Sequence, residues 1–190
     1  MQAILNAIVA HEVLNAGTLL VLYQQAAPDA LLTSSRMTDV AAAKHAHPKY
    51  CMKMATGTGK TWVLQALLIW QVLNKTAALA EGVDDPRFTR QFLIVAPGLI
   101  VYERLLDAFC GKQAGGARDF ASSDIAKFAD LFIPDAHREQ VFGFVRGNVC
   151  AKDEIGLKAT GNGMIAIANW HLLAEGDVVD AEEDMLSPGA

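Results

Sequence analysis

The stretch Met54-Ala55-Thr56-Gly57-Thr58-Gly59-Lys60-Thr61 decides the fold of this chain. It follows a short apolar run, residues 50–54, and opens a strongly apolar run, residues 61–74 (TWVLQALLIWQVLN). Glycines let backbone N–H groups approach a phosphate closely, and a helix beginning at Thr61 directs the positive end of its dipole at the same anion. A lysine followed by a hydroxyl residue adds an ammonium for the terminal phosphates and a ligand for Mg²⁺. The stretch therefore predicts a phosphate-binding loop between a buried strand over 50–54 and a buried helix over 61–74.

This loop supplies the first candidate site residues. The candidate nucleotide-binding residues are Thr56, Gly57, Thr58, Gly59, Lys60 and Thr61. Lys60 and Thr61 are also the candidate catalytic residues, and Thr61 is the candidate Mg²⁺ ligand. The strict pattern has a glycine five residues before Gly59, where this chain has Met54. The alternative interpretation is a glycine-rich turn that carries a solvated lysine.

Composition and charge exclude several classes of protein. The 190 residues carry a formal charge of −5, and 52% of them are hydrophobic, which argues against a disordered chain and against purely electrostatic nucleic-acid binding. Cys51, Cys110 and Cys150 are far apart and odd in number, which indicates free thiols in a reducing compartment. No apolar run reaches the roughly 18 residues of a membrane span, and no basic residue precedes the apolar N-terminal stretch. We therefore expect a cytoplasmic protein without a membrane segment.

Apolar runs alternate with helical patterns along the chain. Further strands are predicted at residues 92–95, 141–149 and 164–168, and a helix at residues 99–109. Unbroken apolar strands between helices indicate an α/β fold, in which helices cover both faces of a parallel sheet. We expect an N-terminal helical segment over 1–47, the sheet domain over 48–173 and an acidic linker over 174–190.

Three segments resemble motifs of the superfamily-two (DEAD/DEAH-like) helicases, most closely the helicase (Res) subunits of type III restriction enzymes. Residues 50–61 resemble motif I, residues 92–105 (FLIVAPGLIVYERL) resemble motif Ia, and residues 165–172 (IAIANWHL) resemble the strand that ends in Asn-aromatic-His. Their order and approximate spacing also fit. The resemblance implies a RecA-like P-loop NTPase domain that uses ATP and Mg²⁺ and couples ATP hydrolysis to movement on double-stranded DNA.

The resemblance also assigns roles to single residues. It implies that Lys60 contacts the β- and γ-phosphates and that Thr61 holds Mg²⁺. Gln24 and Gln25 become candidates for reading the adenine, with two exposed helix glutamines as the alternative. The candidate DNA-binding residues are Pro97, Gly98, Arg104, Asn169 and His171. A solvated helix arginine remains the alternative at Arg104, and ordinary turn chemistry remains the alternative for the Asn-x-His pair. A DNA-methylating or specificity subunit is the implied protein partner.

The catalytic carboxylates of this family are missing from the sequence. The family carries them on a strand that ends in Asp-Glu-x-His, whose Asp positions Mg²⁺ and whose Glu activates water. The only Asp-Glu pair here, Asp153-Glu154, lacks the histidine and precedes the Asn-Trp-His segment, so we interpret it as a surface turn. We therefore expect an N-terminal fragment of a DNA-dependent ATPase, with a sheet incomplete at its C-terminal side, that binds ATP without hydrolysing it.

Two other classes of function fit the same phosphate loop. One is a P-loop ATPase or kinase that acts on substrates other than nucleic acid, because this loop is shared by many activities. The other is a catalytically inactive nucleotide-binding or interaction module, which the missing carboxylates favour for the chain as it stands.

Overall fold

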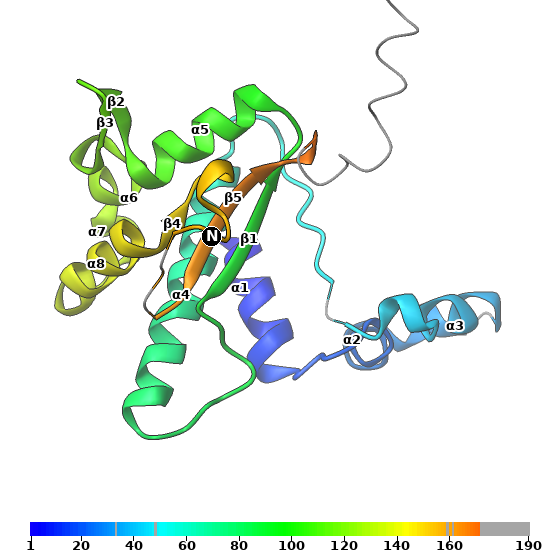
Figure 1. Ribbon diagram of the computed structural model, residues 1–190. Helices are drawn as coiled ribbons and strands as arrows, with labels where there is room; N and C mark the ends of the chain where they lie inside the picture. Colours follow the sequence, from blue (N-terminus) through cyan, green and yellow to red (C-terminus); the bar gives the residue numbers. More distant parts are fainter. Residues whose placement is uncertain (33, 48, 159, 161, 172–190) are drawn as a thin grey trace, which may run out of the picture. The chain divides into compact units, whose positions relative to one another are not determined.

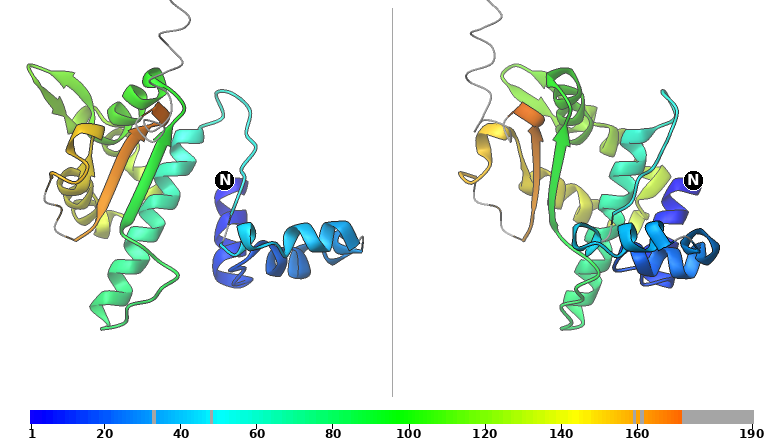
Figure 2. Two further views of the ribbon diagram at one scale, coloured as in Figure 1. Left: turned by 45° about the vertical axis from the view of Figure 1, so that its right-hand side comes forward. Right: turned by 90° about the vertical axis from the view of Figure 1, so that its right-hand side faces the viewer.

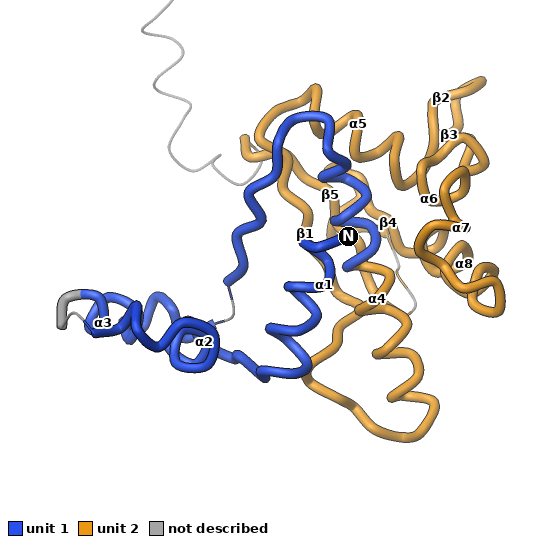
Figure 3. Tube along the Cα trace, turned by 180° about the vertical axis from the view of Figure 1, so that it is seen from behind, with its two compact units in different colours: residues 1–67 blue, residues 68–190 orange. Residues whose placement is uncertain are grey.

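The computed structural model describes residues 1–171 except residues 33, 48, 159 and 161. The chain divides into two compact units, Met1–Leu67 and Leu68–Ala190, which are coloured separately in Figure 3. The boundary falls inside one helix, α4 (Lys60–Ala80). The expected linker over 174–190 lies outside the described residues, and the expected domain boundaries stay predictions.

The first unit is built from short helices. They are α1 (Gln2–Ile8), which continues into a π-helical segment (Val9–Val13), α2 (Leu19–Ala26) and α3 (Ser34–Val40), with 3-10 turns at Pro28–Leu31 and Ala43–His45. Thr18 defines the start of α2, because its side-chain oxygen accepts a hydrogen bond from the Val21 N–H at 3.2 Å. These helices agree with the helical character expected over residues 1–47.

Residues 50–54 do not form the strand that the sequence predicts. The segment has no strand partner among the described residues, and a strand exists only where a second strand satisfies its N–H and C=O groups. Instead, the segment lies beside the helices of its own unit, and the Tyr50 hydroxyl donates to the Ala16 carbonyl at 3.4 Å. Its composition favours a strand, but its neighbours are helices.

The second unit holds a parallel sheet of three strands in the order β1 (Gln91–Ala96), β5 (Met164–Asn169), β4 (Val149–Cys150). Figure 1 shows β5 between the other two. β1 and β5 pair in parallel from Gln91↔Met164 to Ala96↔Asn169, so the two strands end at the same edge of the sheet. This confirms the predicted strands over 92–95 and 164–168 and the parallel α/β class.

β5 and β1 differ in how well they are covered. Residues 165–169 of β5 are buried on both faces, as expected for a central parallel strand. In β1 only one face is buried, at Ile94 and Ala96, whereas Leu93 is 59% and Val95 39% exposed. The prediction that both faces of this strand are covered is therefore wrong for the described structure.

Helices and a hairpin make up the rest of the second unit. They are α5 (Leu99–Cys110), the antiparallel hairpin β2 (Lys112–Ala114) with β3 (Ala117–Asp119), α6 (Asp124–Lys127), α7 (Ala129–Phe132) and α8 (Arg138–Asn148), with 3-10 turns at Phe120–Ser122, Asp135–His137 and Lys152–Glu154. α5 confirms the predicted helix over 99–109. It packs on β1 and β5, and its inner face includes the fully buried Phe109.

α8 replaces the strand that the sequence predicts over 141–149. Val141 and Val145 lie one helical turn apart and are both 1% exposed, so they form the buried stripe of a helix. The amide of Asn148 donates to the Phe144 carbonyl at 2.8 Å near the helix end. Only Val149 and Cys150 continue as a strand, β4. Mixed apolar patterns of this length do not separate helix from strand by themselves.

α4 is longer and less buried than predicted. Its part in the second unit, residues 68–80, runs along one face of the sheet (Figure 2). Trp62 near the start of α4 is 39% exposed, and Leu79 near its end is 42% exposed. Of the described helices, this one is long and apolar enough to cross a membrane by length and composition. Its second half is tied to residues 81–90: the Gln71 side-chain oxygen accepts from the Thr89 N–H at 2.9 Å, and the Trp70 ring contacts Phe88 edge-on. Such bonds are typical of a helix within a folded domain.

Candidate phosphate-binding site

The predicted phosphate loop is a turn that leads directly into α4. Gly57 and Gly59 have φ angles of 77° and 84°, in the left-handed region that glycine adopts without strain. A Cβ at Gly57 would meet nothing within 4 Å, and at Gly59 only the Trp62 side chain at 3.8 Å. Both glycines are therefore required by backbone conformation. Steric crowding by neighbouring atoms is not the reason for glycine at either position.

The loop is closed by side chains that bond back to its first residue. The Thr58 hydroxyl and the Lys60 ammonium both donate to the Ala55 carbonyl, each at 2.7 Å. The helix begins here, with the Val63 N–H donating to the Gly59 carbonyl at 3.0 Å. Lys60 is exposed, so its ammonium can leave the neutral carbonyl for a phosphate at little cost. The first turn of a helix leaves backbone N–H groups without partners in the helix, which suits an anion at this position.

A cavity of about 650 Å³ lies in the first unit and is lined in part by residues 49–54, which come directly before the loop in the sequence. α1, the π-helical segment after it and α2 supply apolar walls that include Ala10 and Leu22. Residues 49–54 supply the remaining wall up to Met54, the residue before the loop. Sequence reasoning missed this cavity, because it exists only through the packing of residues 49–54 against the helices. The cavity is large enough for a small ligand.

Gln24 and Gln25 stay predictions as adenine-contacting residues. Both lie on α2 and are exposed. Their neighbours Leu22 and Ala26 line the cavity, whereas the two glutamines do not belong to its walls.

The predicted DNA-binding residues lie in the second unit and most of them converge. Ala96 pairs with Asn169 at the ends of β1 and β5. Pro97 and Gly98 come directly after β1 and His171 comes shortly after β5, so all three lie at the same edge of the sheet. Asn169 is 6% exposed, whereas Pro97 and His171 are exposed. The carboxyl edge of a parallel sheet is where ligands collect in such folds. Arg104 lies apart from this edge, exposed along α5.

The Asp153-Glu154 pair forms the predicted surface turn. Both residues are exposed and lie in the 3-10 turn after β4. The carboxylate of Glu154 accepts from the Ala151 N–H at 2.8 Å and lies 3.9 Å from the Lys158 ammonium. These local bonds give Glu154 a structural role in the turn.

The comparisons with known proteins agree with the sequence motifs. The family model of the type III restriction enzyme res subunit matches residues 19–145, which is more than half of the chain. The chain therefore belongs to this family, whose class is that of helicase-like ATPases. The match includes the phosphate loop and the Pro97-Gly98 turn but ends before Asn169. Searches of the curated proteins and of the solved structures gave no match.

Proposed function

We propose that this chain is the ATP-binding part of a DNA-dependent translocase of the type III restriction class, with a RecA-like fold. The phosphate loop carries the proposal. One turn combines the features that bind a nucleoside triphosphate: two glycines with left-handed φ angles, the exposed Lys60 and the start of α4. Membership in a helicase-like ATPase family supports ATP and Mg²⁺ as the cofactors.

Each residue of the loop has a distinct part in the proposed binding. The backbone of Thr56 to Gly59 surrounds the phosphates, the Lys60 ammonium exchanges the Ala55 carbonyl for the β- and γ-phosphates, and the Thr61 hydroxyl ligates Mg²⁺. The cavity lined by residues 49–54 lies next to the loop in sequence and would receive the base and ribose. Bound Mg²⁺ would supply charge neutralisation for phosphoryl transfer.

The catalytic carboxylates would come from a strand beyond those described. No carboxylate directly follows β1 or β5 in the described structure, because Pro97 and Trp170 stand there. β1 pairs only with β5 among the described strands, so its other backbone edge has no strand beside it there. This edge supports a further parallel strand beside β1. The exposed Leu93 and Val95 form an apolar face of a kind that helices normally cover in parallel sheets. We infer that the chain as given binds ATP without hydrolysing it.

Titration of the purified chain with a fluorescent ATP analogue and Mg²⁺ tests the proposal. Binding should be saturable, and Lys60→Ala should weaken it at least tenfold, since a charge-assisted bond to phosphate contributes more than about 1.4 kcal/mol. The matched control is Lys127→Ala, which removes another exposed lysine at the end of α6. Equal affinities for the two variants would exclude the phosphate loop as the site. Steady ATP hydrolysis abolished by Lys60→Ala would instead show that the chain carries its own carboxylates.

DNA binding needs a separate test, because it concerns the other unit. We propose that Pro97, Gly98, Asn169 and His171 contact the DNA backbone at the sheet edge and that Arg104 adds a phosphate contact. Arg104→Ala should lower the affinity for labelled duplex DNA and reduce the slope of log affinity against log salt by about one. Arg36→Ala removes an exposed arginine on α3 and serves as the control. An unchanged slope for Arg104→Ala would remove this residue from the interface.

A further inference from the structure

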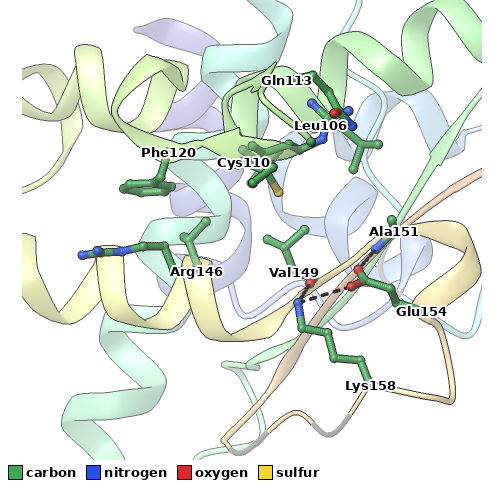
Figure 4. Close-up of a pocket in the computed structure, with 14 residues that line it drawn as sticks. Leu106, Cys110, Gln113, Phe120, Arg146, Val149, Ala151, Glu154 and Lys158 are labelled. Atoms are coloured by element: carbon green, nitrogen blue, oxygen red, sulfur yellow. Dashed lines mark hydrogen bonds and ion pairs between the residues drawn. The ribbon is translucent and has the colours of Figure 1, made fainter.

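A second cavity, of about 420 Å³, lies entirely within the second unit and has no part in the proposed nucleotide or DNA sites. Figure 4 shows its walls: the end of α5, the β2–β3 hairpin, the end of α8 and residues 149–158. The lining residues run from Leu106 to Lys158 in the sequence and converge only in the fold. The volume is in the range of small-molecule sites.

The floor of this cavity is apolar. Leu106, Phe109, Val145 and Val149 line it, and all four are at least nine-tenths buried. The Cys110 thiol lies beside them, labelled in Figure 4, and burial raises its pKa. An apolar floor of this kind favours an aromatic or aliphatic ligand body, because each buried CH₂ group contributes roughly 0.8 kcal/mol.

Three cationic side chains and one carboxylate line the walls, and they differ in how firmly they are paired. Arg118 is fully engaged, since it donates to Asp107 at 2.7 Å, to Glu103 at 2.9 Å and to the Gly111 carbonyl at 2.8 Å. It therefore holds the hairpin against α5 and has little capacity left for a ligand.

Lys158 and Arg146 are held more loosely. Among the described residues, the Lys158 ammonium donates one hydrogen bond, to the Val149 carbonyl at 2.6 Å, and it lies 3.9 Å from the Glu154 carboxylate, beyond hydrogen-bond length. An ammonium has three donors, so Lys158 can bond an anion without giving up the Val149 carbonyl. Arg146 lies over the Phe120 ring at 5.1 Å and 4.0 Å from Glu139, so it forms a cationic wall.

We propose that this cavity binds a small amphiphilic anion, with its apolar body on the floor formed by Leu106, Phe109, Val145 and Val149 and its anionic group at the Lys158 ammonium. The Phe120–Arg146 pair supplies one wall against which an aromatic body can stack. The Glu154 carboxylate lies 3.9 Å from the Lys158 ammonium and weakens the attraction of Lys158 for an anion. The anionic group of the ligand must displace this ion pair, as a carboxylate or sulfonate can. The site is independent of ATP.

The probe for this test is 8-anilinonaphthalene-1-sulfonate, which joins an aromatic body to one anion. N-phenyl-1-naphthylamine has the same aromatic body without the sulfonate and is the matched uncharged probe. In a Cys51→Ser background, Cys110 is the accessible thiol near the cavity, because Cys150 is buried. The full chain should bind the sulfonate at one saturable site. The bound sulfonate should slow the reaction of Cys110 with a thiol reagent at least tenfold. The uncharged probe should bind at least tenfold more weakly than the sulfonate.

Variants separate this site from general apolar surface. Lys158→Met should weaken sulfonate binding about tenfold and leave the uncharged probe unchanged, whereas Lys127→Met, outside the cavity, should alter neither. Ala117→Trp adds bulk at an exposed hairpin position that lines the cavity and should abolish both binding and protection of Cys110 without removing a core residue. Binding without protection of Cys110, or equal losses for Lys158→Met and Lys127→Met, would overturn the proposal.

Discussion

Replacing Gly111 by alanine should unfold the second unit far more readily than a conformationally matched replacement. Gly111 ends α5 with a φ of 85°, and a Cβ there would lie 1.7 Å from the Asp119 carbonyl oxygen and 2.8 Å from the Ser122 hydroxyl. Gly116, at the hairpin tip, has a φ of 88°, but a Cβ there would meet nothing within 4 Å. The two alanine variants therefore share the conformational cost and differ in the clash.

The magnitude follows from these contacts. Alanine in the left-handed region costs about 1–2 kcal/mol, which is the full expected loss for Gly116→Ala. At Gly111 the Asp119 carbonyl must also move by more than 1 Å to restore an ordinary contact, since 1.7 Å is far below any real separation. That movement disturbs the Ser122 hydroxyl, which donates to Asp119 and accepts from the Lys112 N–H, both at 2.7 Å. Overpacking and two weakened hydrogen bonds add about 2–4 kcal/mol, for a total loss of about 3–6 kcal/mol.

Urea unfolding followed by circular dichroism measures the free energy of unfolding of both variants and of the unmodified chain. The loss for Gly111→Ala should exceed that for Gly116→Ala by at least about 2 kcal/mol. Equal losses would refute the reasoning, because they would mean that the close approach of the hairpin to the end of α5 does not exist.

Three further predictions concern a helix cap, an ion pair and the cysteine thiols. Thr18→Ala should destabilise the first unit by about 1 kcal/mol in urea unfolding, because the cap of α2 is lost, whereas Thr18→Ser should retain most of that stability. Hydrogen bonding from Arg87 lowers the pKa of Asp85 to about 2. The Asp85–Arg87 pair therefore stabilises the fold above the unfolded pKa of about 3.8 and loses this effect as the pH falls to 2. The difference in unfolding free energy between the unmodified chain and Asp85→Asn should shrink over that range, and a constant difference would contradict the pairing. Thiol labelling followed by mass spectrometry should show that the exposed Cys51 reacts first and that Cys110 reacts more slowly, because burial raises the pKa of Cys110. The buried Cys150 should react only on unfolding. Early labelling of Cys150 would show that β4 is not buried.

Local patterns were sufficient for the phosphate loop and for several elements. Gly57 and Gly59 adopt left-handed angles that glycine takes without strain, and the long apolar run after Lys60 forms the predicted helix. The two strands with unbroken apolar runs, β1 and β5, were also predicted, whereas the pairing of Ala96 with Asn169 at one edge was found only in the structure.

The two failed strand predictions share one physical cause. A strand forms only where a second strand hydrogen-bonds its N–H and C=O groups, and the local sequence does not indicate which segment that second strand is. Residues 50–54 have a strand-like composition but lie beside α1 and α2, and Val141 and Val145 turn out to belong to a helical stripe. The exposed face of β1 is a related case, since its coverage depends on elements far away in the chain.

The sequence by itself determined the chemistry of the phosphate loop, because a run of eight residues contains the glycines, the lysine, the hydroxyl and the start of the helix. Only the tertiary structure decided where cavities form. The walls that join Leu106, Arg118, Val145 and Lys158 come from four separate segments, and their meeting depends on packing and loop closure rather than on any local pattern. The same packing decides which cations stay available to a ligand, since Arg118 is neutralised by Asp107 and Glu103 while Lys158 keeps free donor capacity.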